Sequence, residues 1–255
     1  MLYSTLVRQG NWLFRWRGHL PFAFLGLVLV GVAMEPPPAW ALHPLWRALC
    51  IGLATLSLGL RTLTVGYAAP RTSGRNTRGQ IADSLNTTGP YSLVRHPLYV
   101  ANGCGWLAVA LWTGRPWLAA TVMAVFVFVY ERIMLAEEAY LAEKFGPRYA
   151  AWAARTPAVV PRRWRWVPPR HPFAWRRVLR SEYTTLLDLV GALVLVDVAQ
   201  RYALGRRPCL DRPAALAFLG ALGVYLLLWT VKHATRWLDD PAPSEARHRG
   251  ARARV

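Results

Sequence analysis

Apolar blocks alternate with arginine-rich segments along the chain, and this alternation limits the fold more than any other feature. Six blocks approach the roughly 20 residues that a helix needs to cross a bilayer. Of the 255 residues, 54% are hydrophobic and only 17% are charged, which excludes an ordinary soluble enzyme. We therefore predict an all-α integral membrane bundle of about six transmembrane helices. The six blocks are Leu20–Met34, Leu45–Ala68, Leu98–Trp112, Trp117–Leu135, Thr185–Tyr202 and Ala214–Val231.

The distribution of arginine predicts the orientation of these helices. The loop Glu35–Pro44 has no Lys or Arg, whereas Pro70–Pro97 has four and Ala136–Tyr183 has ten. Because cytoplasmic loops carry an excess of basic residues, we predict cytoplasmic N- and C-termini in a bacterial inner membrane. The loop that contains Arg206 runs against this topology. Arg61, inside the second block, would need a partner if it faces the bundle interior.

The net charge of +18 could also indicate a nucleic-acid binder. The arginines are spread over several loops and both tails, however, and no nucleic-acid motif accompanies them. Anionic lipid head groups explain a basic membrane face equally well, so the predicted partner is the membrane and not nucleic acid. Cys50, Cys104 and Cys209 show no metal-ligand spacing, and we predict no metal site.

The turn Thr113–Pro116 brings distant polar residues together. A four-residue connection makes the third and fourth apolar blocks antiparallel neighbours. The start of one then lies beside the end of the other, so His96 and Glu138 are predicted to line one pocket at the cytoplasmic end of this hairpin. Pro97 suits the first turn of a helix, and the N–H groups at such a helix start can receive an anion.

An ordered set of residues surrounds this hairpin. It comprises Gly89-Pro90-Tyr91, Val94-Arg95-His96-Pro97-Leu98-Tyr99, Glu137-Glu138, Leu141, Phe145-Gly146, Tyr149 and Pro161. The set covers about a third of the chain and resembles the superfamily of isoprenylcysteine carboxyl methyltransferases and phospholipid methyltransferases. The resemblance implies methyl transfer from S-adenosylmethionine to a lipid-borne acceptor in the bilayer. It also implies that no nucleotide-binding α/β domain is needed, and Gly103 and Gly105 lack the third glycine of that fingerprint.

The resemblance assigns roles to individual residues. Arg95 and His96 are the predicted catalytic residues, although His96 would act as a base only for a neutral acceptor. The cofactor presents a sulfonium, an amino group, a carboxylate and an adenosine, which call for aromatic faces, carboxylates and cations. Positioning and desolvation can then carry an in-line methyl transfer. The implied cofactor shell is Tyr91, Arg95, His96, Pro97, Tyr99, Glu137, Glu138 and Tyr149.

The predicted acceptor is a lipid phosphate or carboxylate. The segments Ser73–Thr77 and Leu85–Gly89 resemble the superfamily branch associated with lipid A phosphate methylation. Guanidinium groups bind phosphate in a bidentate manner, which makes arginines beside the cofactor site suitable for such an acceptor. Glu131 is added because it lies seven positions before Glu138 on one helix face. The predicted substrate-binding residues are Arg75, Asn76, Arg78 and Glu131.

Two other functions stay open at this point. An NADPH-dependent membrane reductase related to sterol reductases would use a similar helical pocket, and a non-enzymatic lipid-binding protein would keep the pocket without chemistry. The oligomeric state also stays open. We divide the chain into N-terminal helices (1–69), a methyltransferase core (70–165), C-terminal helices (166–236) and a disordered basic tail (237–255).

Overall fold

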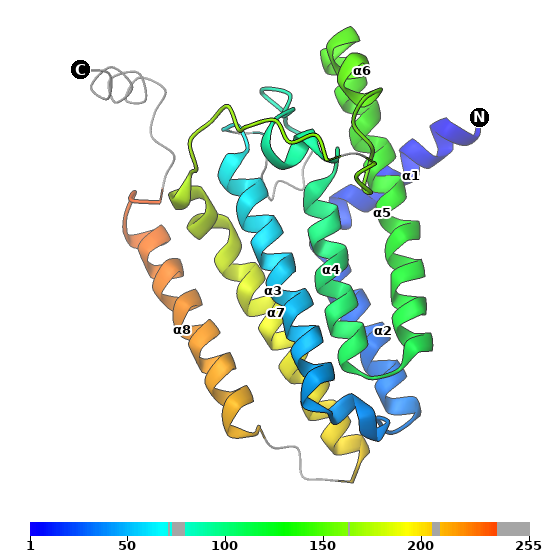
Figure 1. Ribbon diagram of the computed structural model, residues 1–255, viewed down its shortest axis with the longest axis vertical. Coiled ribbons are helices and arrows are strands. Elements are labelled where there is room, and N and C mark those ends of the chain that lie inside the picture. The colour runs from blue at the N-terminus through cyan, green and yellow to red at the C-terminus, as the bar shows by residue number, and fades with distance from the viewer. Residues whose placement is uncertain (71, 73–79, 163, 206–209, 239–255) are drawn as a thin grey trace.

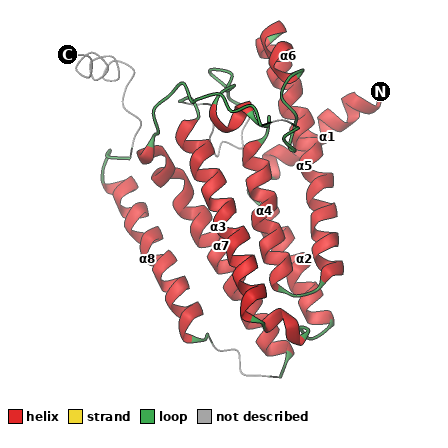
Figure 2. Cartoon of the chain, viewed as in Figure 1, coloured by secondary structure: helices red, strands yellow, loops and turns green. Residues whose placement is uncertain are grey.

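The structure is a computed structural model that describes residues 1–70, 72, 80–162, 164–205 and 210–238. Within these residues the chain is entirely helical and contains no strand, which confirms the all-α prediction (Figures 1 and 2). Two short 3-10 helices, Ala39–Leu42 and Gly89–Ser92, accompany the α-helices. The α-helices are α1 (Leu2–Trp16), α2 (Leu20–Met34), α3 (Pro44–Tyr67), α4 (Pro97–Trp112), α5 (Pro116–Phe145), α6 (Pro147–Ala153), α7 (Trp175–Ala203) and α8 (Arg212–Ala234).

Each predicted apolar block coincides with one of the long helices. By length and composition, α3, α5 and α8 are able to cross a membrane, and the pair α1–α2, bent by 87°, adds at most one more span. Helices α2 and α4 have only 15 and 16 residues, fewer than the roughly 20 that a full crossing needs. The described chain therefore has three helices that are long and apolar enough to cross a membrane, whereas six crossings stay a prediction.

The long helices form one bundle. Helix α7 packs against α2, α3 and α4, and α8 covers the outer side of α7 (Figure 1). The start of α1 and the end of α8 lie at the same end of the bundle as α6 (Figure 1). Helices from the predicted N-terminal segment (1–69) and from the predicted C-terminal segment (166–236) thus pack in one core. The division of the chain into four segments stays a prediction.

A tight turn joins α4 to α5 and sets their antiparallel contact. Gly114 has φ +70°, and a Cβ at this position would lie only 2.2 Å from the Cβ of Ala41. Glycine therefore serves both the left-handed backbone and the close approach. The Thr113 hydroxyl donates to the Ala110 carbonyl at 2.7 Å and helps to end α4. The predicted neighbourhood of the two helices is confirmed.

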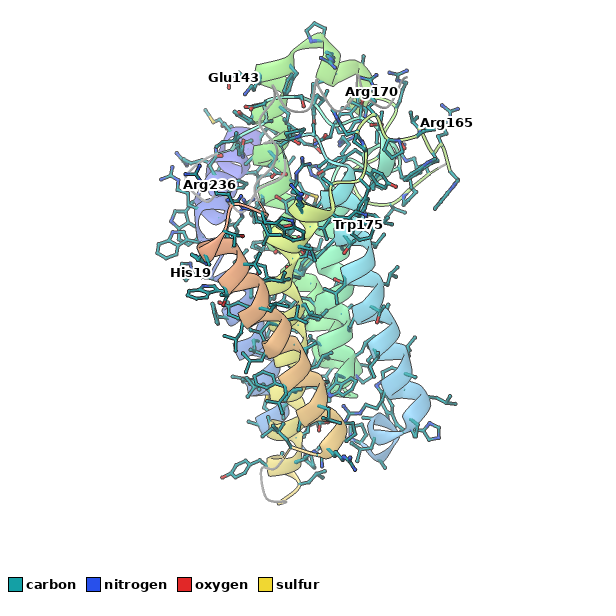
Figure 3. All side chains as sticks on the ribbon, turned by 90° about the vertical axis from the view of Figure 1, so that its left-hand side faces the viewer. His19, Glu143, Arg165, Arg170, Trp175 and Arg236 are labelled. Atoms are coloured by element: carbon teal, nitrogen blue, oxygen red, sulfur yellow. The ribbon has the colours of Figure 1, made fainter. Side chains whose placement is uncertain are left out.

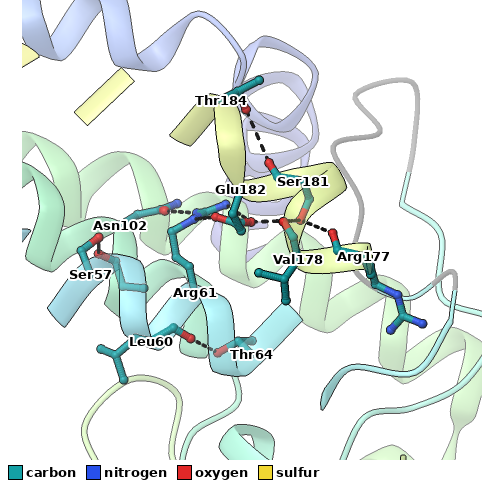
Figure 4. Close-up of polar contacts among 11 residues, drawn as sticks. Ser57, Leu60, Arg61, Thr64, Asn102, Arg177, Val178, Ser181, Glu182 and Thr184 are labelled. Atoms are coloured by element: carbon teal, nitrogen blue, oxygen red, sulfur yellow. Dashed lines mark hydrogen bonds and ion pairs between the residues drawn. The ribbon is translucent and has the colours of Figure 1, made fainter. Parts of the chain in front are cut away.

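A polar cluster lies inside the bundle between α3, α4 and α7 (Figure 4). Arg61 Nε lies 2.6 Å from Glu182 Oε2, and Arg61 Nη2 lies 3.1 Å from Glu182 Oε1. Arg61 Nη1 also donates to Asn102 Oδ1 at 2.5 Å. The partner that a buried Arg61 requires is therefore a carboxylate from the C-terminal part of the chain.

Candidate functional site

A cavity of about 340 Å³ lies where α4 begins and α5 approaches its end. This volume is within the usual range for small-molecule sites, which starts at roughly 300 Å³. Helix α1, the segment 80–86 and α6 complete its walls. Seven of the eight predicted cofactor residues line this cavity, namely Tyr91, Arg95, His96, Pro97, Tyr99, Glu137 and Tyr149.

The backbone before α4 is fixed by a distant segment of the chain. Pro97 occupies the first turn of α4, and His96 is the N-cap residue. The backbone N–H of Arg95 donates to the Pro157 carbonyl at 2.8 Å, and that of His96 donates to the Ala158 carbonyl at 3.0 Å. The chain that follows α6 therefore holds the Arg95-His96 pair at the mouth of α4.

Glu138 joins the two elements of the hairpin. A single carboxylate oxygen, Oε1, lies 2.9 Å from Arg95 Nε, 2.9 Å from Arg95 Nη2 and 2.9 Å from His96 Nε2. The predicted proximity of His96 and Glu138 is thus confirmed. Glu138 itself does not line the cavity among the described residues, so it acts behind the cavity wall by orienting Arg95 and His96.

The guanidinium of Arg95 is engaged by the protein on several sides. Besides its two contacts with Glu138, its Nη1 donates to the carbonyls of Ala153 at 3.1 Å and Thr156 at 2.7 Å. Charge-assisted hydrogen bonds of this kind are roughly twice as strong as neutral ones. Arg95 therefore ties the start of α4 to α5 and to the end of α6 while one side of it faces the cavity.

His96 is held between two carboxylates. Its side chain is 4% exposed, with Nδ1 3.5 Å from Glu137 Oε2 and Nε2 2.9 Å from Glu138 Oε1. Burial alone would lower the pKa of His96, but hydrogen bonds to Glu137 and Glu138 and their negative charges outweigh burial and raise it. The ring also stacks on Tyr99, with centroids 5.6 Å apart. A histidine with a raised pKa favours the doubly protonated form, which donates hydrogen bonds and does not accept a proton.

Aromatic side chains form much of the remaining wall. Tyr149 and Trp152 meet edge to face with ring centroids 5.8 Å apart, and both line the cavity. Burial raises the pKa of Tyr91, with Glu137 adding to the effect, and burial likewise raises the pKa of Tyr149. Both phenols therefore stay neutral at physiological pH and present aromatic faces and hydroxyl groups to a ligand.

Three buried donors at the cavity test whether a polar ligand fits. Within the described part of the chain, Trp152 Nε1, Gln80 Nε2 and the Tyr149 hydroxyl are buried and have no hydrogen-bond partner. A buried donor without a partner costs about 1–3 kcal/mol. A ligand with ribose hydroxyls, ring nitrogens or a carboxylate offers acceptors to such donors. Together with the Glu137 carboxylate and the tyrosine faces, this donor set fits the polar groups of S-adenosylmethionine.

The predicted substrate-binding residues have different outcomes. Arg75, Asn76 and Arg78 lie outside the residues that the structure describes. Glu131 is exposed and does not line the cavity, so the structure does not bring it to the site. The seven positions from Glu131 to Glu138 correspond to about 10.5 Å along the helix axis. Sharing a helix face was therefore not sufficient to place Glu131 at the cavity.

Thirteen of the twenty described lining residues were not predicted as site residues, among them Phe14, Arg17, Gln80 and Trp152. Phe14 and Arg17 come from the N-terminal helix and its end, and Gln80 and Trp152 come from either side of the predicted hairpin. The amphipathic pattern of Leu2–Trp16, which lies next to the first apolar block, was a usable signal for a helix that packs on the bundle. Its position beside α5, however, is a tertiary feature.

Comparison with known proteins supports the predicted resemblance. The model of the family described as phospholipid methyltransferase covers all of α4 and α5 and most of α3. Residues 48–148 match the phospholipid methyltransferase family. The resemblance predicted from the sequence is thus confirmed. The segment that matches the phospholipid methyltransferase family includes Arg95, His96, Glu137 and Glu138, whereas α1, α7 and α8 lie outside it.

Two relatives carry names that concern metal resistance. The nickel-cobalt-cadmium resistance protein NccN of Alcaligenes xylosoxydans xylosoxydans is 33% identical over 120 residues, which are 47% of this chain and 56% of that protein. The cobalt-zinc-cadmium resistance protein CzcN of Cupriavidus metallidurans is 32% identical over 120 residues, or 47% of this chain and 55% of that protein. The match thus spans about half the length of each relative. No solved structure matches the chain.

The described residues contain no group of three or more His, Cys, Asp or Glu side chains that could hold a metal ion. The site around His96 combines one histidine, two carboxylates and an arginine. What this arrangement can do chemically is to orient a polar ligand and to donate hydrogen bonds to an anion.

Proposed function

We propose that the protein is an S-adenosylmethionine-dependent membrane methyltransferase that transfers a methyl group to an anionic oxygen, a phosphate or a carboxylate, of a lipid. The observation that carries this proposal is the cavity at the start of α4. There the motif residues of the phospholipid methyltransferase segment meet the buried aromatic and donor groups of α6 and the segment before Gly89. The family match supports the reaction class, and the donor set supports the cofactor.

The chain's own residues would hold the cofactor by complementary charge and shape. Glu137 offers a carboxylate to an amino group or to ribose hydroxyls, and Tyr91, Tyr99 and Tyr149 offer aromatic faces to a sulfonium. Trp152 Nε1, Gln80 Nε2 and the Tyr149 hydroxyl offer donors that have no partner within the described residues. When bound, S-adenosylmethionine supplies an electrophilic methyl group with a neutral thioether as its leaving group.

The protein's contribution to such a transfer is positioning. Glu137 and Glu138 raise the pKa of the largely buried His96, which favours its role as a hydrogen-bond donor over a role as a general base. An acceptor oxygen that is already anionic needs no general base, which makes a phosphate or carboxylate a better acceptor than an alcohol. Exclusion of water from the cavity would strengthen each electrostatic contact.

We place the site at the cytoplasmic membrane face of a six-span bundle. The exposed residues Arg165, Arg170 and Arg236 lie at the end of the bundle that carries α6 and the cavity (Figure 3). An excess of arginine beside membrane helices supports a cytoplasmic orientation of that end. The same arginines suit an anionic lipid surface.

The names of the two relatives suggest a consequence of this reaction. Methylation of a lipid phosphate oxygen removes one negative charge from the membrane surface, and divalent cations bind such charges. An organism with methylated lipid phosphates would hold less nickel, cobalt, zinc or cadmium at this surface. A knockout strain that binds more cadmium per cell, and regains the lower value upon complementation, would support this link.

Calorimetric titration of the detergent-purified chain tests the proposed function. We expect S-adenosylmethionine and S-adenosylhomocysteine to bind and NADPH not to bind. His96→Ala should lower the affinity for both adenosyl ligands by at least tenfold, since a lost charge-assisted contact costs about 1.5–3 kcal/mol. His171→Ala, at an exposed position, is the matched control and should leave both affinities unchanged. Binding of NADPH alone would contradict the proposed methyltransferase and favour a reductase. If neither NADPH nor an adenosyl ligand binds, a lipid-binding protein is favoured.

A further inference from the structure

Helix α1 lies across the end of the bundle and exposes aromatic side chains. It is bent by 87° from α2 and projects sideways beside α5 (Figure 1). Tyr3, Trp12 and Trp16 are 58%, 58% and 49% exposed, and Arg8 and Arg15 are exposed as well. Tryptophan, tyrosine and arginine on one amphipathic helix are typical of helices that lie at the depth of the lipid head groups. Helix α1 therefore marks the membrane interface beside the cavity.

The inner side of α1 is fixed against α5 at close range. A Cβ at Gly10 would lie 1.9 Å from the Arg132 carbonyl oxygen, so only glycine permits this approach. Arg132 Nε also donates to Gln9 Oε1 at 3.1 Å, and Phe14 is 4% exposed within the core. The position of α1 relative to α5 is thus determined by packing, just before α5 reaches Glu137.

This packing delivers a guanidinium to the cavity. Arg17 follows the last residue of α1, at the bend toward α2, and it lines the cavity together with Phe14. Its Cζ lies 4.0 Å from the centroid of the Phe14 ring. Among the described lining residues the other arginine is Arg95, which lies at the start of α4. Arg17 is the lining arginine that comes from the end of α1, the helix that carries the exposed Trp12 and Trp16.

We infer that Arg17 binds the anionic head group of the methyl acceptor and that α1 forms the acceptor side of the site. This inference rests on the proposed function and adds to it a binding residue outside the phospholipid methyltransferase segment. A guanidinium pairs with a phosphate or carboxylate in a bidentate manner. Trp12 and Trp16 hold the helix at the interface, where the head group of a bilayer lipid is also located.

Binding of short-chain lipids to the full detergent-purified chain tests the inference. The probes are dihexanoyl phosphatidic acid, dihexanoyl phosphatidylcholine and inorganic phosphate, each titrated calorimetrically. We expect Arg17→Gln to lower the affinity for phosphatidic acid about tenfold, as the loss of one charge-assisted contact implies. Arg17→Lys keeps the charge without the bidentate geometry, so its affinity for phosphatidic acid should lie between those of the wild type and Arg17→Gln. Arg8→Gln removes an exposed arginine from the same helix, outside the cavity lining, and should leave the affinity for phosphatidic acid unchanged.

Titration of S-adenosylhomocysteine into the same variants separates this inference from the proposed function. Unchanged affinity for it in Arg17→Gln shows an intact bundle and assigns the lost affinity to the acceptor. If Arg17→Gln instead loses the adenosyl ligand and keeps phosphatidic acid, Arg17 serves the cofactor and the inference is wrong. Equal affinity of Arg17→Gln and Arg8→Gln for phosphatidic acid, no binding by the wild type, or equally tight binding of inorganic phosphate would overturn it too. A wild type that binds phosphatidic acid but no adenosyl ligand overturns only the proposed function.

Discussion

The ion pair between Arg61 and Glu182 gives a prediction that does not depend on the function. Glu182→Gln removes a carboxylate that makes contacts of 2.6 and 3.1 Å with the guanidinium. The two side chains are only 14% and 9% exposed, so water can replace the lost partner only in part. Breaking a buried pair from one side costs about 3–5 kcal/mol, because an uncompensated charge remains. Asn102 keeps its single contact with Arg61 and does not carry a charge.

Replacement of both partners by apolar residues should cost far less. Arg61→Met combined with Glu182→Leu removes both charges, and such exchanges are commonly neutral or stabilising. For a chain of this size, 1 kcal/mol corresponds to a shift of about 2–4 °C in Tm. The single variant should therefore lose roughly 6–20 °C, and the double variant should recover most of that loss.

Thermal unfolding in detergent, followed by circular dichroism, measures both changes. The exposed Glu143→Gln is the matched control, since it removes the same group from another helix without breaking a buried pair. Equal losses of Tm in the single and double variants would show that side-chain packing, and not charge pairing, stabilises this position. A single variant as stable as the wild type would refute the reasoning altogether.

Three further predictions concern the site. Because the pKa of His96 is raised above its ordinary value of 6.5 by Glu137 and Glu138, this histidine stabilises the fold fully below about pH 6.5 and loses that contribution as the pH rises through the raised pKa. Thermal unfolding against pH should show the decline, and His96→Gln should remove it. Glu138→Gln should weaken S-adenosylhomocysteine binding at least tenfold in calorimetry, since it removes the negative charge that Arg95 and His96 share. Gly10→Ala should displace α1 from α5, and limited proteolysis should then cleave α1 faster.

Controls for these predictions lie on the same elements. Glu143→Gln on α5 should leave the affinity for S-adenosylhomocysteine unchanged. Gly26→Ala on α2, where a Cβ meets nothing within 4 Å, should leave proteolysis unchanged. A pH profile that is identical in the wild type and in His96→Gln would contradict the assigned protonation, and equal effects of Glu138→Gln and Glu143→Gln would contradict the role of the shared oxygen.

The hairpin was predictable because its evidence is local. A four-residue turn between two apolar blocks leaves only an antiparallel arrangement, so the meeting of His96 and Glu138 followed from chain geometry. The rest of the site depends on tertiary packing. The bend after α1 that brings Arg17 to the cavity, and the choice of Glu182 as the partner of Arg61, join segments far apart in sequence. Glu131 lies outside the cavity lining for the same reason, since helix periodicity predicts which residues share a face but not which element packs against that face.

The same ion pair affects how the bundle is made. Arg61 enters the membrane with α3, but its carboxylate partner lies 121 residues further along the chain and is synthesised much later. During this interval the guanidinium has no Glu182 to pair with in the hydrocarbon, where a lone charge is costly. We expect α3 to remain at the translocon or near the interface until α7 arrives. Membrane integration of α3 in chains truncated before α7 should then be incomplete, so the bundle would insert as a unit and not one helix at a time.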